Sequence, residues 1–137
     1  MIIREIKNTD FDVLRKLFLK ERQDTFFWLD PTEFKLDDFE KHIKGELVLV
    51  ATDQEIPVGF ISIWMPNTFI HHFYVDQKYQ GKGVGTLLLN AAIQKTLLPI
   101  TLKCLEENTK AVAFYRKKDL SKKKEAHLNM EIIFCLS

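Results

Sequence analysis

Three glycines at alternate positions, in the segment Gln80-Gly81-Lys82-Gly83-Val84-Gly85, constrain the fold of this chain more than any other feature. An apolar segment with the pattern of a β-strand ends at Val75, and an apolar segment with helical spacing begins near Val84. Glycine allows the backbone to turn its N–H groups inward, and the amino terminus of a helix adds a partial positive charge. The segment therefore predicts a loop that binds an anion such as phosphate, with Lys82 as an additional charge.

Other phosphate-binding loops fit this segment less well. A Walker loop requires Gly-Lys-Ser/Thr, whereas Lys82 is followed here by Gly83. A dinucleotide-binding loop has the spacing G-x-G-x-x-G after the opening strand of a βαβ unit. Here the third glycine comes one residue early, and the strands before it have the pattern of an antiparallel meander. Generic nucleotide binding is therefore the least supported interpretation.

The rest of the chain alternates between strand and helix patterns. Strands are expected at 2–7, 46–52, 58–64, 68–75, 99–105 and 130–136, and helices at 11–25, 36–43, 84–95 and 109–118. This order predicts the α+β class (an α/β sandwich), with a single mixed, mostly antiparallel sheet flanked by helices. Because the sequence contains no repeat or linker, residues 1–137 are expected to form one domain.

Composition narrows the classes of function. Hydrophobic residues make up 46% of the sequence and aromatic residues 12%, which argues against disorder. The formal net charge is only +1, which argues against a nucleic-acid partner. Cys104 and Cys135 lie in apolar runs, and no Cys/His pattern in the sequence predicts a metal. Neither a signal peptide nor a membrane span is expected, so a cytoplasmic location without a membrane partner is predicted.

Two segments resemble one known family. The run from Val75 to Gly85 resembles the acetyl-coenzyme A motif of the GNAT acetyltransferases, which begins with Gln or Arg and continues x-x-Gly-x-Gly/Ala; Gln80, Gly83 and Gly85 match it. The run from Asn108 to Tyr115 resembles the family's later motif, and the order of elements is similar to the family fold from end to end. The resemblance implies an N-acetyltransferase that moves an acetyl group from acetyl-CoA to a primary amine by direct attack in a ternary complex.

The resemblance also implies roles for individual residues. Phe73 and Val75 would offer backbone groups to the pantetheine arm, which lies like an extra strand against a splayed sheet edge. Asn108 would contact the cofactor, and Tyr115 would protonate the departing thiolate. The pyrophosphate would be bound mainly by backbone N–H groups of the glycine loop, formed by Gln80, Gly81, Lys82, Gly83, Val84, Gly85 and Thr86.

The prediction of the proton acceptor uses positions where this sequence departs from the family pattern as well as positions that match it. Some family members carry a Glu at the position where Lys103 stands here, and others use a histidine on the strand before the glycine loop. Strand alternation places His71 on the face of Phe73 and Val75, with His72 on the opposite face. His71 is therefore the predicted base, directly or through water, unless a bulge reverses this choice. Both histidines also fit sheet positions without a chemical role.

A second function stays open at this stage. Lys103 supplies no carboxylate, and Asp119-Leu120 replaces the Gly-Phe that commonly ends the family's second-motif helix. The alternative is a non-catalytic coenzyme A-binding domain that acts as a sensor or interaction module. The acceptor is expected to be an amine-bearing small molecule or a peptide, and the sequence leaves open whether the chain forms a homodimer.

Two further segments allow two interpretations each. Phe26-Phe27-Trp28 precedes the region that, by resemblance, covers the acceptor site, and it predicts either a pocket for an apolar amine or simple packing. The basic cluster from Arg116 to Lys124 is typical of a solvated surface. Contact with the 3′-phosphate of coenzyme A is its less favoured alternative.

Overall fold

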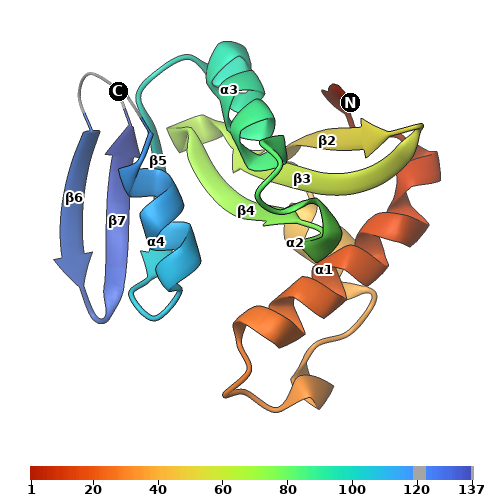
Figure 1. Cartoon of the computed structure of the whole chain (residues 1–137), viewed down its shortest axis with the longest axis horizontal. Helices are drawn as coiled ribbons and strands as arrows, with labels where there is room; N and C mark the ends of the chain where they lie inside the picture. The colour runs from red at the N-terminus through yellow and green to blue at the C-terminus, as the bar shows by residue number, and fades with distance from the viewer. Residues whose placement is uncertain (119–122, 137) are drawn as a thin grey trace.

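In the computed structural model, which describes residues 1–118 and 123–136, seven strands form one sheet in the order β1-β2-β3-β4-β5-β7-β6 (Figure 1). All neighbouring pairs are antiparallel except β4 and β5, which are parallel. This confirms the expected mixed, mostly antiparallel sheet. The strands are β1 (Ile2–Glu5), β2 (Leu47–Asp53), β3 (Ile56–Trp64), β4 (Phe69–Val75), β5 (Ile100–Leu105), β6 (Lys123–Leu128) and β7 (Glu131–Leu136).

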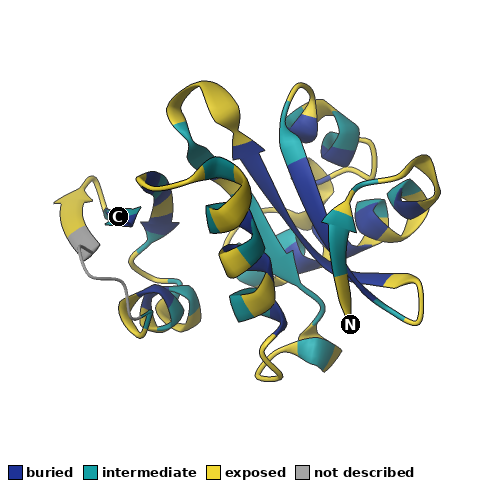
Figure 2. Cartoon of the chain, turned by 90° about the horizontal axis from the view of Figure 1, so that it is seen from above, coloured by how far each residue is buried: buried dark blue, intermediate teal, exposed yellow. Residues whose placement is uncertain are grey.

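Helices cover both faces of this sheet. They are α1 (Phe11–Thr25), α2 (Asp38–Ile43), α3 (Val84–Thr96) and α4 (Thr109–Arg116). Along α1 the buried residues Leu14, Leu17, Phe18 and Glu21 recur at helical spacing, so one stripe of the helix faces the sheet. Alternate residues of β2 enter two separate core clusters, one beneath α1 and α2 and the other beneath α3 and α4. Figure 2 shows these buried strands between helices whose outer surfaces are exposed.

The sheet opens in its middle. Strands β4 and β5 pair only at Phe69↔Thr101 and Ile70↔Leu102. Beyond these pairs the two strands diverge, with α4 packed against the β5 side (Figure 1). The opening leaves backbone groups of β4 without a neighbouring strand on one side, and such an edge can accept an extended ligand.

A β-bulge in β4 breaks the alternation on which the prediction for His71 depended. Ser62 of β3 pairs with His72, whereas the next residue, Ile63, pairs with Ile70, so His71 is the extra residue. The ring of His71 therefore lies 3.9 Å from the ring of His72, measured between centroids. Both rings are on the α1/α2 side, whereas Phe73 packs against the core beneath α3. The expectation that His71 shares a face with Phe73 is wrong.

The other departures from expectation lie near the carboxyl end. The Lys-rich segment was not expected to form a strand, but β6 pairs with β7 along its whole length, across a turn at Asn129 and Met130 with positive φ. The repeated lysines obscured the alternation that identifies a strand. Asp119, Leu120 and Lys122 lie outside the described residues.

Among the described helices, none combines the length and the apolar character that crossing a bilayer requires.

Candidate active site

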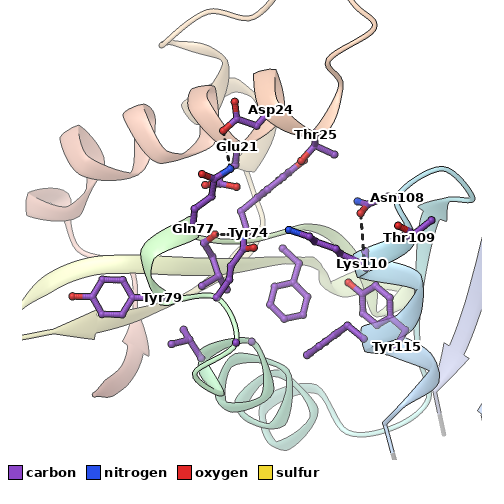
Figure 3. Close-up of a pocket in the computed structure, with 18 of the residues that line it drawn as sticks. Glu21, Asp24, Thr25, Tyr74, Gln77, Tyr79, Asn108, Thr109, Lys110 and Tyr115 are labelled. Atoms are coloured by element: carbon purple, nitrogen blue, oxygen red, sulfur yellow. Dashed lines mark hydrogen bonds between the residues drawn. The ribbon is translucent and has the colours of Figure 1, made fainter.

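A large cavity lies where β4 and β5 diverge. Its volume is about 740 Å³, which is within the usual range for cofactor and ligand sites. One wall is formed by α1 and the segment after it, the opposite wall by α4, and the floor by β4 and the glycine loop (Figure 3). Every residue predicted to contact the cofactor lines this cavity except Lys82: Phe73, Val75, Gln80, Gly81, Gly83, Val84, Gly85, Thr86 and Asn108.

The glycine loop has the conformation that its sequence indicates. Gly81 and Gly83 have φ angles of 76° and 85°, in the left-handed region that side chains disfavour. Gly83 is the residue before α3, so the first-turn N–H groups of that helix, which have no partner within the helix, lie at the cavity. The side-chain amide of Gln80 donates a hydrogen bond to the Val75 carbonyl, 3.0 Å away, and this ties the loop to β4. The arrangement can bind a phosphate group.

Two lysines near the loop differ in position. The Lys82 ammonium lies outside the cavity lining, 5.6 Å from the centre of the Tyr79 ring. Lys118, from the predicted basic cluster, donates a hydrogen bond to the Thr86 hydroxyl in the first turn of α3, and its ammonium lies 4.2 Å from the centre of the Phe114 ring. Burial lowers the pKa of Lys118. Among the described side chains of that cluster, Lys118 therefore reaches the glycine loop.

Helix α4 forms the wall opposite α1. The Asn108 side chain accepts a hydrogen bond from the Ala111 N–H at 3.3 Å, so Asn108 begins this helix as its sequence predicts. Phe114 packs against Gly85, where an added Cβ would lie 3.3 Å from the ring. The close approach of α4 to the glycine loop therefore depends on the absence of a side chain at Gly85.

Tyr115 lies at the centre of the cleft. Its ring is 6.3 Å from the Phe73 ring and 5.3 Å from the Phe134 ring, and the residue is only 7% exposed. Burial raises the pKa of Tyr115 well above its ordinary value, with smaller contributions from Cys104 and Tyr74. The hydroxyl therefore stays protonated at neutral pH and is able to donate to a developing anion.

A second cavity of about 370 Å³ continues the cleft on the other side of Tyr115. His71, His72 and Lys103 line it, whereas none of these three lines the larger cavity. The two cavities share a set of lining residues: Thr25, Phe73, Tyr74, Asn108, Ala111 and Tyr115. A molecule in one cavity and a molecule in the other would thus meet beside Tyr115.

His71 lines the second cavity from the α1/α2 side of the sheet, and not from the face of Phe73 on which it was predicted. Its Nδ1 atom lies 2.8 Å from Oε2 of Glu46, a carboxylate whose side chain is only 5% exposed. His72 is packed edge-on against Phe18, with ring centroids 4.9 Å apart. The pKa of His72 is lowered to about 3, chiefly by burial and further by the neighbouring His71, His42 and Arg22. His72 is therefore neutral at physiological pH.

Glu21 is a site residue that the sequence reasoning missed. It is 5% exposed, lines the larger cavity, and its Oε1 atom has no hydrogen-bond partner among the described residues. The pKa of Glu21 is raised to about 7, chiefly by burial and further by the carboxylates of Asp24 and Asp76, while the hydrogen bond from the Gln77 N–H opposes this rise. The available signal was its place on the apolar stripe of α1, where a charged residue calls for an explanation.

Comparison with known proteins identifies the class that this fold and cleft define. The family model described as the acetyltransferase (GNAT) family matches residues 11–119. The chain therefore belongs to the GNAT family of acetyltransferases, whose co-substrate is acetyl-CoA. The resemblance inferred from Gln80, Gly83 and Gly85 is confirmed at the level of the family.

Individual relatives agree with this assignment. The peptidyl-lysine N-acetyltransferase YjaB of Salmonella typhimurium is 36% identical over 75 residues, which are 54% of this chain and about half (49%) of that protein. The solution structure of apo YjaB from Escherichia coli covers 99% of this chain and 97% of its own, with a TM-score of 0.73 and 21% identity. The PaiA N-acetyltransferase of Thermoplasma acidophilum, solved with coenzyme A, covers 98% and 97%, with a TM-score of 0.79 and 17% identity. At these identities the two solved structures show a shared fold.

Proposed function

We propose that this protein transfers the acetyl group of acetyl-CoA to a primary amine. The observation that carries the proposal is the position of the glycine loop and Tyr115 on one cavity, at the point where β4 and β5 diverge. The pyrophosphate is bound by the N–H groups of the loop from Gln80 to Thr86, and the pantetheine arm lies along β4 near Phe73 and Val75. The thioester then reaches Tyr115 between the two cavities.

The reaction is a direct attack in a ternary complex. The neutral amine nitrogen forms a bond to the thioester carbonyl carbon, the carbon–sulfur bond breaks, and the leaving sulfur takes a proton from Tyr115. The attacking nitrogen loses one proton in the same process. We assign this proton to His71, because His71 and Tyr115 line the same second cavity and Glu46 orients the imidazole.

A comparison of the two adjacent histidines tests this assignment. His71→Gln is expected to lower kcat/KM by at least about tenfold, because general bases typically contribute ~10²–10⁴-fold. His72→Gln is expected to have a much smaller effect, because His72 is buried and packed on Phe18. Steady-state kinetics of both variants, with acetyl-CoA binding as the check on folding, measures the difference. Equal losses in both variants would remove His71 from the mechanism.

The acceptor that fits the larger cavity best carries positive charge. Glu21 and Asp24 present carboxylates from α1 (Figure 3), and the exposed rings of Phe27 and Trp28 lie along the same lining. A lysine side chain has an aliphatic stem for the aromatic rings and an ammonium group for the carboxylates. The activity of the Salmonella relative on peptidyl lysine supports this acceptor class. We therefore propose a lysine-like acceptor in a peptide.

An acceptor panel tests the function as a whole. Purified protein is incubated with acetyl-CoA and with a lysine peptide, a peptide with only a free α-amine, or a small monoamine, and the release of free thiol is measured. We expect turnover, fastest with the lysine peptide. The alternative, a non-catalytic coenzyme A-binding sensor, predicts cofactor binding with no thiol release from any acceptor.

A further inference from the structure

Three of the four histidines of the chain lie together on one side of the sheet. They are His42 of α2 and His71 and His72 of β4, and one ring nitrogen of each lies within 4.8 Å of the others. The bulge causes this cluster, because it turns two consecutive histidines to the same face, and α2 packs over that face. No pattern in the sequence indicates the cluster, since His42 is far from the other two along the chain.

The cluster contains polar atoms whose bonding capacity is not used among the described residues. The Nε2 atom of His72 is buried without a hydrogen-bond partner, and so is Oε1 of Glu46. The second oxygen of Glu46 lies 2.8 Å from Nδ1 of His71. Buried nitrogen and carboxylate atoms are costly when unpaired; a cation bound to Nε2 of His72 would satisfy that nitrogen, and its charge would compensate the Glu46 carboxylate.

The charge around the cluster is also suited to a cation. The charged side chains that act on His42 and His72 are Arg22, Asp38 and Glu46. Lys103 and Glu131 line the second cavity beside the cluster, with opposite charges. Arg22 is paired with Asp38, with Nη1 and Oδ2 3.2 Å apart, so these two charges offset one another. Glu46 remains as a buried negative charge whose contact within the cluster is an imidazole. A divalent ion held by neutral imidazoles would compensate this charge.

We propose that His42, His71 and His72 bind a divalent transition-metal ion of the zinc type, while Glu46 orients His71 from behind. Three imidazoles with a fourth position left open are a common ligand set for Zn²⁺, and a metal-bound histidine usually donates its other nitrogen to a carboxylate. Tetrahedral zinc with Zn–N distances of about 2.0–2.1 Å places its nitrogens roughly 3.3–3.4 Å apart. Side-chain rotation of His71, which is 42% exposed, and of half-buried His42 brings the ligands together.

The ion is an inhibitor, not a cofactor, and this consequence rests on the proposed function. A metal on His71 occupies the imidazole that we assign as the proton acceptor. It also adds positive charge to the second cavity, which meets the larger cavity beside Tyr115, where the amine reacts. Zinc is therefore expected to inhibit acetyl transfer without displacing acetyl-CoA, whose loop lies on the other side of Tyr115.

Titration calorimetry of the untagged chain with Zn²⁺ tests the site directly. We expect one equivalent of Zn²⁺ per chain, and affinity at least about tenfold weaker in His42→Ala, in His71→Ala and in Glu46→Gln. His127→Ala is the matched control, because His127 of β6 is the remaining histidine and lies outside the cluster, beside Glu106 and Glu125. Co²⁺ in place of Zn²⁺ should give the visible absorption of a tetrahedral site. Acetyl-CoA binding by each variant verifies that it is folded.

The outcomes separate the site from its consequence. Equal zinc affinity in wild type, His42→Ala and His71→Ala would overturn the site, and so would a loss in His127→Ala as large as theirs. For the inhibitory role, zinc should inhibit wild type and not His42→Ala, because His42 has no place in the proposed mechanism. Binding without inhibition would overturn the inhibitory role alone. The calorimetric result does not depend on turnover, so a failure of the proposed function would be recognised separately.

Discussion

At the scale of single residues, Tyr115 links the two cavities and is the group we expect to protonate the leaving sulfur. Tyr115→Phe removes the hydroxyl and retains the ring that packs against Phe73 and Phe134. The affinity for acetyl-CoA should therefore be unchanged, while kcat and kcat/KM fall together by at least about tenfold, as loss of a transition-state interaction requires. Calorimetry and steady-state kinetics on the same preparation measure both quantities. Unchanged kcat would leave Tyr115 with a packing role.

The raised pKa of Glu21 predicts how the stability of the fold depends on pH. Its pKa in the folded protein is raised from 4.5 to about 7, so folding favours the protonated carboxyl. The stability associated with that form is complete below the unfolded pKa, near 4.5, and is lost as the pH rises through about 7. Since one pKa unit corresponds to about 1.4 kcal/mol, a rise from 4.5 to about 7 makes the loss at pH 8 roughly 3–4 kcal/mol at most.

Glu21→Gln tests this sign. Gln keeps the shape of the side chain and carries no charge, so its Tm should exceed that of wild type at pH 8 by more than it does at pH 5. Glu33→Gln, at an exposed glutamate, is the matched control and should show no such pH dependence. An identical difference in Tm at both pH values would mean that Glu21 is solvated in the folded protein.

At the scale of elements, we propose that the glycine loop and α3 act as one anion-binding unit. Gly83→Glu places bulk and negative charge where the pyrophosphate would lie, and it forces a side chain into a φ of 85°. Binding of acetyl-CoA should be abolished in calorimetry. Gly83→Ala separates the two effects, because an added Cβ meets no atom within 4 Å. The Ala variant should therefore retain measurable binding, weakened only by backbone strain of about 1 kcal/mol. Wild-type affinity in Gly83→Glu would exclude this loop as the cofactor site.

The structural elements also show which features could be predicted from the sequence and which could not. The loop, the start of α3 and the cap at Asn108 were predictable, because glycine conformation, helix dipoles and capping are local properties. The bulge at His71 was not, since it depends on the register between β3 and β4. Glu21 illustrates an intermediate case, because its helical spacing placed it on the buried face, while its raised pKa depends on burial and on Asp24 and Asp76 around it.

At the scale of the whole molecule, acetyl-CoA should stabilise the fold by joining two halves of a sheet that pair through only two residue pairs. In the proposed binding mode the cofactor would contact β4 and the glycine loop on one side and α4 on the other, so it would bind only when both halves are in place. At a ligand concentration 100 times the Kd, this linkage is worth about 2.7 kcal/mol, or roughly 10 °C in Tm for a domain of this size. Thermal unfolding monitored with increasing acetyl-CoA measures the shift.

Two variants allow the thermal-shift experiment to distinguish an acetyltransferase from a protein that only binds coenzyme A. Tyr115→Phe should show the full thermal shift while its turnover falls, because binding and chemistry depend on different groups. Gly83→Glu should show no shift, because its loop cannot accept the pyrophosphate. A protein that only sensed coenzyme A would show the same shifts with no turnover in any variant, so thermal and kinetic data together separate the two functions. A wild-type Tm that stays constant at saturating acetyl-CoA would contradict both, because a ligand that binds the folded state must stabilise it.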